Sequence, residues 1–569
     1  MSSNDDAKDA VTDAVTGPGG KTIIPPVSLK LSRTTTWSDI ETKPVYKPED
    51  TTGTYEEKLG NPGEYPFTRG SFPQMYRSRM WTLRNIVGYG TAADTREGIE
   101  MARRAGQAGF NVVLDTVSGI GVDPDHPALE AEVGLDGCSI GHLDDLDVLF
   151  DGIDPTETDV AWHATHNIYP LMVAFAKQKG YDLAKLQGSH MPDYLKYNLD
   201  GGGEKFMSPE LSHRMAIDTV EYAVRNTPKW ALGYPQVYNI RERGITPATE
   251  IALGLAIAAT TFQDLAERGL SVDEIAPSMA WVSTSDIDFF EEVAKFRALR
   301  RMWARMVKER FGGTNPRAMR LRIAVHTSGR SLVYQQPLNN LTRTAIETLA
   351  ALAGGVQSVE TCTYDEPVSI PTHEARELSI RQQLILAHEV GAARTADPLG
   401  GSYYVEWLTD KLEEDALAIQ VKLEEKGIVK SVEDGSFEAL MDEYNLKRQE
   451  EIDNGERILI GVNAFVPESE PEPQRFTFDG APVKDYVQEF RAKKARRDLP
   501  RLVARMRDVF DSVRDGRNTQ PAMVEAFLAG ATVGEMSGVL RQASGMQYDP
   551  YLVLESPFDF ERARYLEHV

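Results

Sequence analysis

The segment from Phe67 to Thr95 reads FTRGSFPQMYRSRMWTLRNIVGYGTAADT, and it precedes a long alternation of short apolar runs and amphipathic stretches. It includes Arg77, Arg79 and Arg84, together with a tyrosine, a tryptophan and a turn flanked by glycines. Guanidinium groups bind phosphate through paired hydrogen bonds. We therefore expect an arm that lies along the following domain and holds an elongated anionic ligand.

From about residue 107 the chain alternates between strand-like runs and segments with helical periodicity. The predicted strands are residues 109–114, 159–164, 186–190, 236–240, 278–282, 321–326, 357–361 and 394–397. Eight such units predict an α/β fold, a (β/α)₈ TIM barrel with an N-terminal arm and a C-terminal helical extension. An open doubly wound sheet is the alternative, but no G-x-G-x-x-G fingerprint follows a strand.

The segments outside the repeats divide the chain around the predicted barrel. The predicted divisions are a disordered tail at 1–35, an N-terminal arm at 36–106, the barrel at 107–410, a helical extension at 411–466, a linker at 467–483 and a helical docking region at 484–569. Proline and glutamate dominate the linker, where the chain reads PESEPEPQ. Such composition is typical of an extended connection.

Composition excludes several classes of function. The net charge of −24 argues against nucleic-acid binding, which needs a basic surface. Two cysteines, Cys138 and Cys362, imply no disulfide framework and fit a reducing cytoplasm. No apolar run has the length of a membrane span, and the N-terminus lacks the features of a signal peptide.

Polar side chains gather at the predicted carboxyl ends of the strands, where barrel enzymes place their chemistry. These are Asp115, His163, His166, His190, Asn239, His326 and Glu360. Histidines from different strands can bind zinc or iron, but no H-E-x-x-H motif occurs, and we favour a polar lining of a ligand cavity. Cys362 has no nucleophile elbow around it and is expected to be a buried small residue.

Several motifs closely resemble the large, barrel-bearing subunit of the adenosylcobalamin-dependent acyl-CoA mutases, the methylmalonyl-CoA mutase family. They occur in family order over about residues 60–465: PFTRGSFPQMYRSRMWTLRNIVGYGT, DPDHP, EVGLDGCSI, FFEEVAKFRALRRMWARM, HTSGRSL, YDEPVSIPT, DPLGGSYYVEWLT and ILIGVNAF. The layout is closest to isobutyryl-CoA and 2-hydroxyisobutyryl-CoA mutase large subunits. The resemblance implies a cytoplasmic isomerase in which a cobalt–carbon bond breaks homolytically and a group migrates between adjacent carbons.

The resemblance also implies partners. The family's cobalt ligand lies in D-x-H-x-x-G, and no histidine here has an aspartate two positions before it. We therefore expect no metal ligand in this chain and a separate small subunit that carries adenosylcobalamin. A dimer of heterodimers and a G-protein chaperone are compatible with the resemblance.

Site residues follow from the family's motifs by position. Those expected to hold CoA are Phe72, Met75, Arg79, Thr82 and Arg84. Those expected to face the corrin or adenosyl group are Leu114, Glu242, Gly329, Arg330 and Glu366. Those expected around the reacting acyl group are Ile86, Val113, His190, Asn239 and His326.

Several of these positions depart from the family. Ile86 replaces an aromatic residue, Gly201 a carboxylate-binding arginine, Asn239 a histidine, Met191 and His326 glutamines, Ser278 an arginine, and Cys362 an asparagine. Without the arginine, a free carboxylate would be buried unpaired, so methylmalonyl-CoA is not the expected substrate. His163, His190 and His326 are candidates to replace the lost polar contacts. Two alternatives stay open: a carrier other than CoA or a free acid, and a non-catalytic paralogue that binds a partner subunit.

Overall fold

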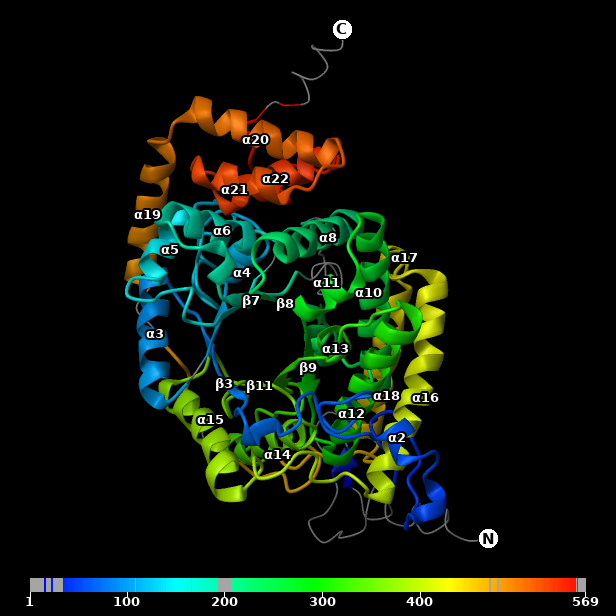
Figure 1. The fold of residues 1–569 in the computed structure, drawn as a ribbon. Coiled ribbons are helices and arrows are strands. Elements are labelled where there is room, and N and C mark those ends of the chain that lie inside the picture. The colour runs from blue at the N-terminus through cyan, green and yellow to red at the C-terminus, as the bar shows by residue number, and fades with distance from the viewer. Residues whose placement is uncertain are drawn as a thin grey trace.

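A parallel sheet curls around a central axis and nearly closes into a barrel (Figure 1). The computed structural model describes residues 15–16, 22–23, 34–107, 109–164, 166–192, 206–469, 472–477, 480–558 and 560. The strand order is β3-β11-β10-β9-β8-β7-β6-β5-β4. The edge strands β3 (Thr82–Arg84) and β4 (Ile86–Val87) are separated by Asn85 alone, so one short run of chain joins both ends of the sheet.

Six predicted strands are confirmed, with shifted ends. They are β5 (Phe110–Val113), β6 (Val160–His163), β7 (Gly188–His190), β9 (Met279–Ser285), β10 (Ile323–Thr327) and β11 (Ser358–Glu360). The prediction for 236–240 is wrong, because β8 (Trp230–Gln236) ends there and the chain turns into the helix α9 (Tyr238–Glu242).

The prediction of a strand at 394–397 is also wrong, because those residues form a bend and irregular structure. The missing strand is the run 82–87, inside the segment expected to be a ligand-binding arm. Leu83 and Val87 are buried, whereas Thr82 and Arg84 line the central cavity. An arginine on the inner face disguises the alternation that would otherwise indicate a strand.

Helices surround the sheet (Figure 1). The main ones are α3 (Ala92–Ala105), α5 (Leu143–Leu149), α6 (Ile168–Lys179), α8 (Pro209–Asn226), α10 (Pro247–Glu267), α12 (Phe289–Arg305), α14 (Asn340–Ala353) and α15 (His373–Ile385). Hydroxyl or carboxylate side chains cap the amino ends of most of them, for example Ser208 before α8 and Asp288 before α12. Gly106 ends α3 with a φ of 104°, which a residue with a side chain rarely adopts.

The smaller elements belong to the loops and the N-terminal region. They are β1 (Val15–Thr16), β2 (Thr22–Ile23), α2 (Tyr55–Lys58), α4 (Thr116–Gly119), α11 (Val272–Ile275), α13 (Pro316–Met319), the 3₁₀ turns Pro48–Asp50, Met75–Arg77, Leu183–Lys185, Ala276–Ser278 and Pro337–Asn339, and the π-turns Met306–Arg310 and Leu386–Val390. Within the described part of the chain, no helix combines the length and the apolar content that crossing a bilayer requires.

The helices after the barrel pack back onto it. The helix α16 (Tyr403–Lys426) lies against α10 and α12 and is followed by α17 (Ile428–Glu433) and α18 (Ser436–Asp453). Four further helices, α19 (Ala481–Ala495), α20 (Leu499–Arg514), α21 (Gln520–Leu528) and α22 (Val533–Ala543), cover the barrel near α5, α6 and α8 (Figure 1). Asp123 holds them there by accepting bonds from Lys494 Nζ at 2.8 Å and Gly534 N–H at 2.7 Å.

Candidate active site in the barrel

A cavity of about 410 Å³ runs along the inside of the barrel. Residues two apart on the strands line it, such as Ala161 with His163 and Ala324 with His326, because alternate side chains of a strand face the same side. All five residues predicted to hold CoA are in its lining: Phe72, Met75, Arg79, Thr82 and Arg84. The arm and the barrel interior therefore form one continuous site.

Three arginines precede the amino ends of β3 and β10, and we call them the arginine mouth: Arg79 and Arg322, which line the cavity, and Arg320. Arg79 is exposed and makes no ion pair with another described residue. Arg320 lies over the Phe72 ring at 4.6 Å. Desolvation and the neighbouring charge of Arg320 lower the pKa of Arg322, and a bound anion would relieve that repulsion.

Arg320 and Arg322 were missed from the sequence. The Arg322 guanidinium donates to the carbonyls of Pro277 at 2.9 Å and Met279 at 3.2 Å, on either side of Ser278. By the family resemblance, Ser278 stands where the family has an arginine. A guanidinium from the neighbouring strand thus lies beside it, and the two arginines flanking Leu321 were the only signal in the sequence.

Arg84 is already engaged within the protein. Its Nε donates to Ser358 Oγ at 2.8 Å, its Nη1 donates to Asn111 Oδ1 at 3.2 Å, and its Nη2 pairs with Asp159. Ser358 is in β11, Asn111 is in β5, and Asp159 directly precedes β6. Arg84 therefore ties the barrel together, and its charge is balanced before any ligand arrives.

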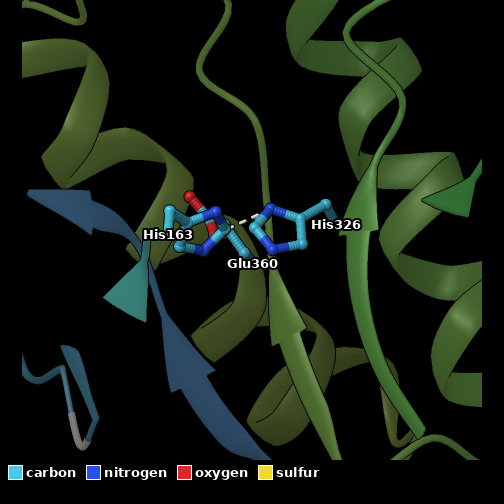
Figure 2. Close-up of side chains that lie close together, drawn as sticks. All are labelled: His163, His326 and Glu360. Carbon is cyan, nitrogen blue, oxygen red and sulfur yellow. Dashed lines mark ion pairs between the residues drawn. The ribbon is translucent and has the colours of Figure 1, made fainter. Parts of the chain in front are cut away.

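Two histidines and a glutamate meet at the inner end of the cavity (Figure 2). The register of β10 and β11 places His326 directly opposite Glu360, and His326 Nδ1 lies 2.8 Å from Glu360 Oε2. His163 comes from β6, and its ring meets that of His326 edge to face with centroids 4.7 Å apart. The structure therefore brings His326 together with His163 and Glu360, and its role around the acyl group stays a prediction.

Tyr238 is a further residue that sequence reasoning missed. Its ring stacks on His326 with centroids 4.4 Å apart and an interplanar angle of 29°. It was hidden because residues 236–240 were expected to be a strand, whereas α9 turns this side chain back over the barrel. The adjacent Asn239 accepts a hydrogen bond from Gln236 Nε2.

Two further predicted acyl-group residues, Ile86 and Val113, face the same side of the sheet as cavity-lining residues. Ile86 pairs in register with Asn111, and Val113 pairs with His163. Both side chains are half-buried. Leu114 follows directly and is buried, with its N–H bonded to the carbonyl of His163 at 3.3 Å. Gly201 lies outside the described residues.

Three predicted cofactor residues come together beyond the carboxyl ends of the strands. Glu242 Oε2 accepts the N–H of Arg330 at 2.8 Å. A Cβ added at Gly329 would lie 3.7 Å from Glu242 Oε2 and 3.7 Å from Glu366 Cγ, so the glycine leaves a gap between two carboxylates. Burial and the nearby Asp286 raise the pKa of Glu242. Its Oε1 is buried without a hydrogen bond from a described residue.

This carboxylate arrangement fits the edge of a corrin ring. The amide N–H groups of a corrin are donors, and a buried carboxylate oxygen lacking a bond is an acceptor in need of one. Arg330, on the other side of Gly329, donates from Nη2 to Asn445 Oδ1 at 2.7 Å and so is fixed by α18.

A buried charge network holds α9 in place. Arg241 lies 3.2 Å from Asp286 and 3.6 Å from Glu292, and it donates to the carbonyl of Ile245 at 2.7 Å. Lys295 pairs with Glu292 at 2.5 Å. Tyr238 and Glu242, at the two ends of α9, are thereby set against the barrel opening.

His190 is not brought into the cavity. Its neighbours Ser189 and Met191 line the cavity, so alternation turns His190 to the opposite face of β7. There it accepts a hydrogen bond from Trp230 Nε1 at 2.9 Å and stacks on Tyr169. Burial lowers its pKa to about 3 and keeps it neutral. Cys362 is buried, and burial raises the pKa of its thiol, which removes its nucleophilic character.

Comparison with known protein families gives one match that covers most of the chain. The sequence profile of the family described as methylmalonyl-CoA mutase matches residues 35–546. The chain belongs to the methylmalonyl-CoA mutase family. It is thus a member of a family of cobalamin-dependent acyl-CoA mutases, which are isomerases.

Individual relatives of this mutase-family chain span most of its length. The 2-hydroxyisobutanoyl-CoA mutase large subunit of Aquincola tertiaricarbonis is 36% identical over 88% of the chain and 90% of the relative. The methylmalonyl-CoA mutase of Rhizobium meliloti is 34% identical over 89% of the chain and 72% of the relative. The human mitochondrial methylmalonyl-CoA mutase is 33% identical over 89% of the chain and 68% of the relative.

Proposed function

We propose that this chain is the large, substrate-binding subunit of an adenosylcobalamin-dependent mutase that rearranges an acyl-CoA other than methylmalonyl-CoA. One observation carries the proposal: the five residues expected to hold CoA all line a single cavity inside the barrel. In this proposal the arginine mouth binds the phosphates of CoA, and the pantetheine arm extends inward past Thr82 and Arg84.

The acyl group would lie at the inner end of the cavity. His163 and His326 line that region and make it polar, and Ile86 and Val113, which pair in register with the lining residues Asn111 and His163, would add an apolar side. Arg84, two residues before Ile86, also lines the cavity, and its charge is balanced by Asp159. Arg79 and Arg322 belong to the arginine mouth, so among the described residues at the inner end a free carboxylate on the acyl group would meet no unpaired cation, which argues against methylmalonyl-CoA.

The cofactor would cover the carboxyl ends of the strands. Adenosylcobalamin, when bound, supplies the homolytic chemistry that starts a carbon-skeleton rearrangement. The protein's own contribution is to accept corrin amide donors at Glu242 and Glu366, to leave room at Gly329, and to exclude water from the acyl group. The matched relative from Aquincola is described as a large subunit, which favours a separate cobalamin-carrying small subunit here.

Reconstitution tests the proposal. The chain is mixed with a cobalamin-binding small subunit loaded with adenosylcobalamin, and a panel of acyl-CoA esters is added. We expect one ester to elicit a Co(II) signal in electron paramagnetic resonance and an isomeric product, with methylmalonyl-CoA giving neither. If free acids or thioesters of another carrier give the signal and no CoA ester does, the substrate class in the proposal would change from CoA esters to those compounds. Silence with every compound despite a stable complex would favour a non-catalytic paralogue.

A further inference from the structure

The cluster of His163, His326 and Glu360 has the composition of a metal site. Each residue offers one atom that lies within 4.8 Å of the other two (Figure 2). Two imidazoles and one carboxylate form a ligand set that divalent transition metals occupy in proteins while positions for other ligands stay open. The three residues come from β6, β10 and β11, so the rigid barrel fixes their separation.

The contact between His326 and Glu360 has the geometry of two ligands of one ion. Nδ1 and Oε2 are 2.8 Å apart, yet Nδ1 makes no well-aligned hydrogen bond with any described residue. Two metal–ligand bonds of about 2.1 Å that meet near a right angle separate their donor atoms by about 3 Å. Nδ1 is therefore not held as a hydrogen-bond donor to the carboxylate, and the neutral ring with its proton on Nε2 presents the Nδ1 lone pair to an ion.

The charge balance around Glu360 also favours a cation. The residue is 4% exposed, and among the described residues its carboxylate has no lysine or arginine within 4.0 Å. A buried carboxylate without a compensating charge is costly. A divalent ion between neutral imidazoles would supply that compensation.

The surrounding residues orient the cluster as supporting residues do at metal sites. Asn111 Nδ2 donates to Glu360 Oε2 at 2.5 Å and fixes the carboxylate. The Tyr238 ring lies flat against that of His326 and fixes the imidazole. Such outer contacts determine the direction in which the donor atoms point.

We propose that His163, His326 and Glu360 bind one divalent transition-metal ion at the inner end of the barrel cavity. Opposite ligands of such an ion are about 4.2 Å apart at most, so the side chains need to close by less than about an ångström. The open positions of the ion would face the cavity and accept an oxygen of the bound acyl group. Only this last role depends on the proposed mutase function.

Metal titration of the isolated chain tests the site. Tag-free protein is stripped with a chelator, dialysed, and titrated with Zn²⁺ by calorimetry and with Co²⁺ by visible absorption. We expect one equivalent of either ion and Co²⁺ bands of a mixed nitrogen–oxygen site. His326→Gln and His163→Ala should each weaken binding at least 100-fold, and Asn111→Ala should weaken it about 10-fold. The exposed His388→Gln is the matched control and should bind as the wild type does.

Thermal unfolding gives a second measurement for any variant of reduced stability. Zn²⁺ should raise the midpoint of the wild type and of His388→Gln, but not that of His326→Gln. The absence of a stoichiometric site in the wild type would overturn the proposal, as would equal affinity in the wild type and His326→Gln. Neither cobalamin nor an acyl-CoA is present in these assays. A negative result would therefore overturn the metal site without contradicting the proposed mutase function.

Discussion

Glu242 Oε2 accepts the backbone N–H of Arg330 at 2.8 Å, and this bond joins the helix after β8 to the turn after β10. This contact within the chain holds the Glu242 carboxylate beside Gly329 before any cofactor binds. The face expected to meet the corrin is thus preorganised, and its small gap at Gly329 is bounded by carboxylates whose positions are set by the barrel.

Filling that gap should affect the cofactor and spare the fold. A Cβ at residue 329 makes ordinary contacts of 3.7 Å, so Gly329→Ala should change the free energy of unfolding of the lone chain by less than about 0.5 kcal/mol. Affinity for the cobalamin-loaded small subunit should fall about 10-fold, measured by surface plasmon resonance. Gly480→Ala, with no atom within 4 Å of the added Cβ, is the control. Unchanged affinity in Gly329→Ala would argue against the cofactor position.

The arginine mouth should bind CoA through charge. Removing one charge-assisted phosphate contact costs about 1.5 kcal/mol, so Arg79→Ala should weaken binding of a CoA ester about 10-fold. The loss should shrink at high salt, because Arg79 is exposed. Calorimetry with a stable CoA thioester measures it. Arg103→Ala, on the exposed face of α3, should have no effect; an equal loss there would point to nonspecific charge.

Arg322 should combine binding with support of the loop before β9. Arg322→Ala removes a positive charge and two hydrogen bonds to backbone carbonyls, so both CoA affinity and the free energy of unfolding should fall. Arg322→Lys retains the charge and should recover part of the CoA affinity. It lacks the forked donors of a guanidinium, so it should not recover the lost free energy of unfolding. Parallel calorimetry and urea unfolding separate the effects. Full recovery of both by lysine would contradict the structural role.

The buried network under α9 should be intolerant of a missing partner. Lys295 Nζ lies 2.8 Å from Glu250 and 2.5 Å from Glu292, with all three side chains buried. Lys295→Met removes the closest cation of both carboxylates, leaves them Arg241 alone at 3.6 Å, and should cost about 3–5 kcal/mol. Adding Glu292→Gln should recover part of this loss, measured by denaturant unfolding. Additive losses in the double variant would show that the two residues are not coupled.

His190 should make the protein sensitive to acid. Between its folded pKa of about 3 and an ordinary value of about 6.5, the unfolded chain binds a proton that the folded chain does not. The contribution of neutral His190 to the free energy of unfolding is therefore complete above about pH 6.5. It decreases as the pH drops, by about 2 kcal/mol at pH 5. His190→Asn keeps an acceptor for Trp230 and should flatten this slope in urea unfolding. His388→Gln should leave the slope unchanged, since that side chain is exposed.

Some of the site could be predicted from local sequence. The segment expected to hold CoA and the turns carrying Glu242, Gly329 and Glu366 are short motifs, and the structure brings the residues of each group together, while their roles stay predictions. The strand β3 and the residue Tyr238 could not be predicted in this way. An inward arginine masked the apolar alternation of the strand, and the turn after β8 reversed the direction in which Tyr238 points.

The sequence by itself determined the α/β repeat, the membership in a mutase family and the arginine-containing segment before the barrel, because periodicity and motifs are local properties of the chain. Only the tertiary structure decided that His163 and His326, from strands that are not neighbours, meet beside Glu360, and that His190, one residue from the cavity lining, does not. The reason is physical: the direction of a strand residue depends on its register in the nearly closed sheet, and a shift of one residue moves a side chain from the cavity to the opposite face.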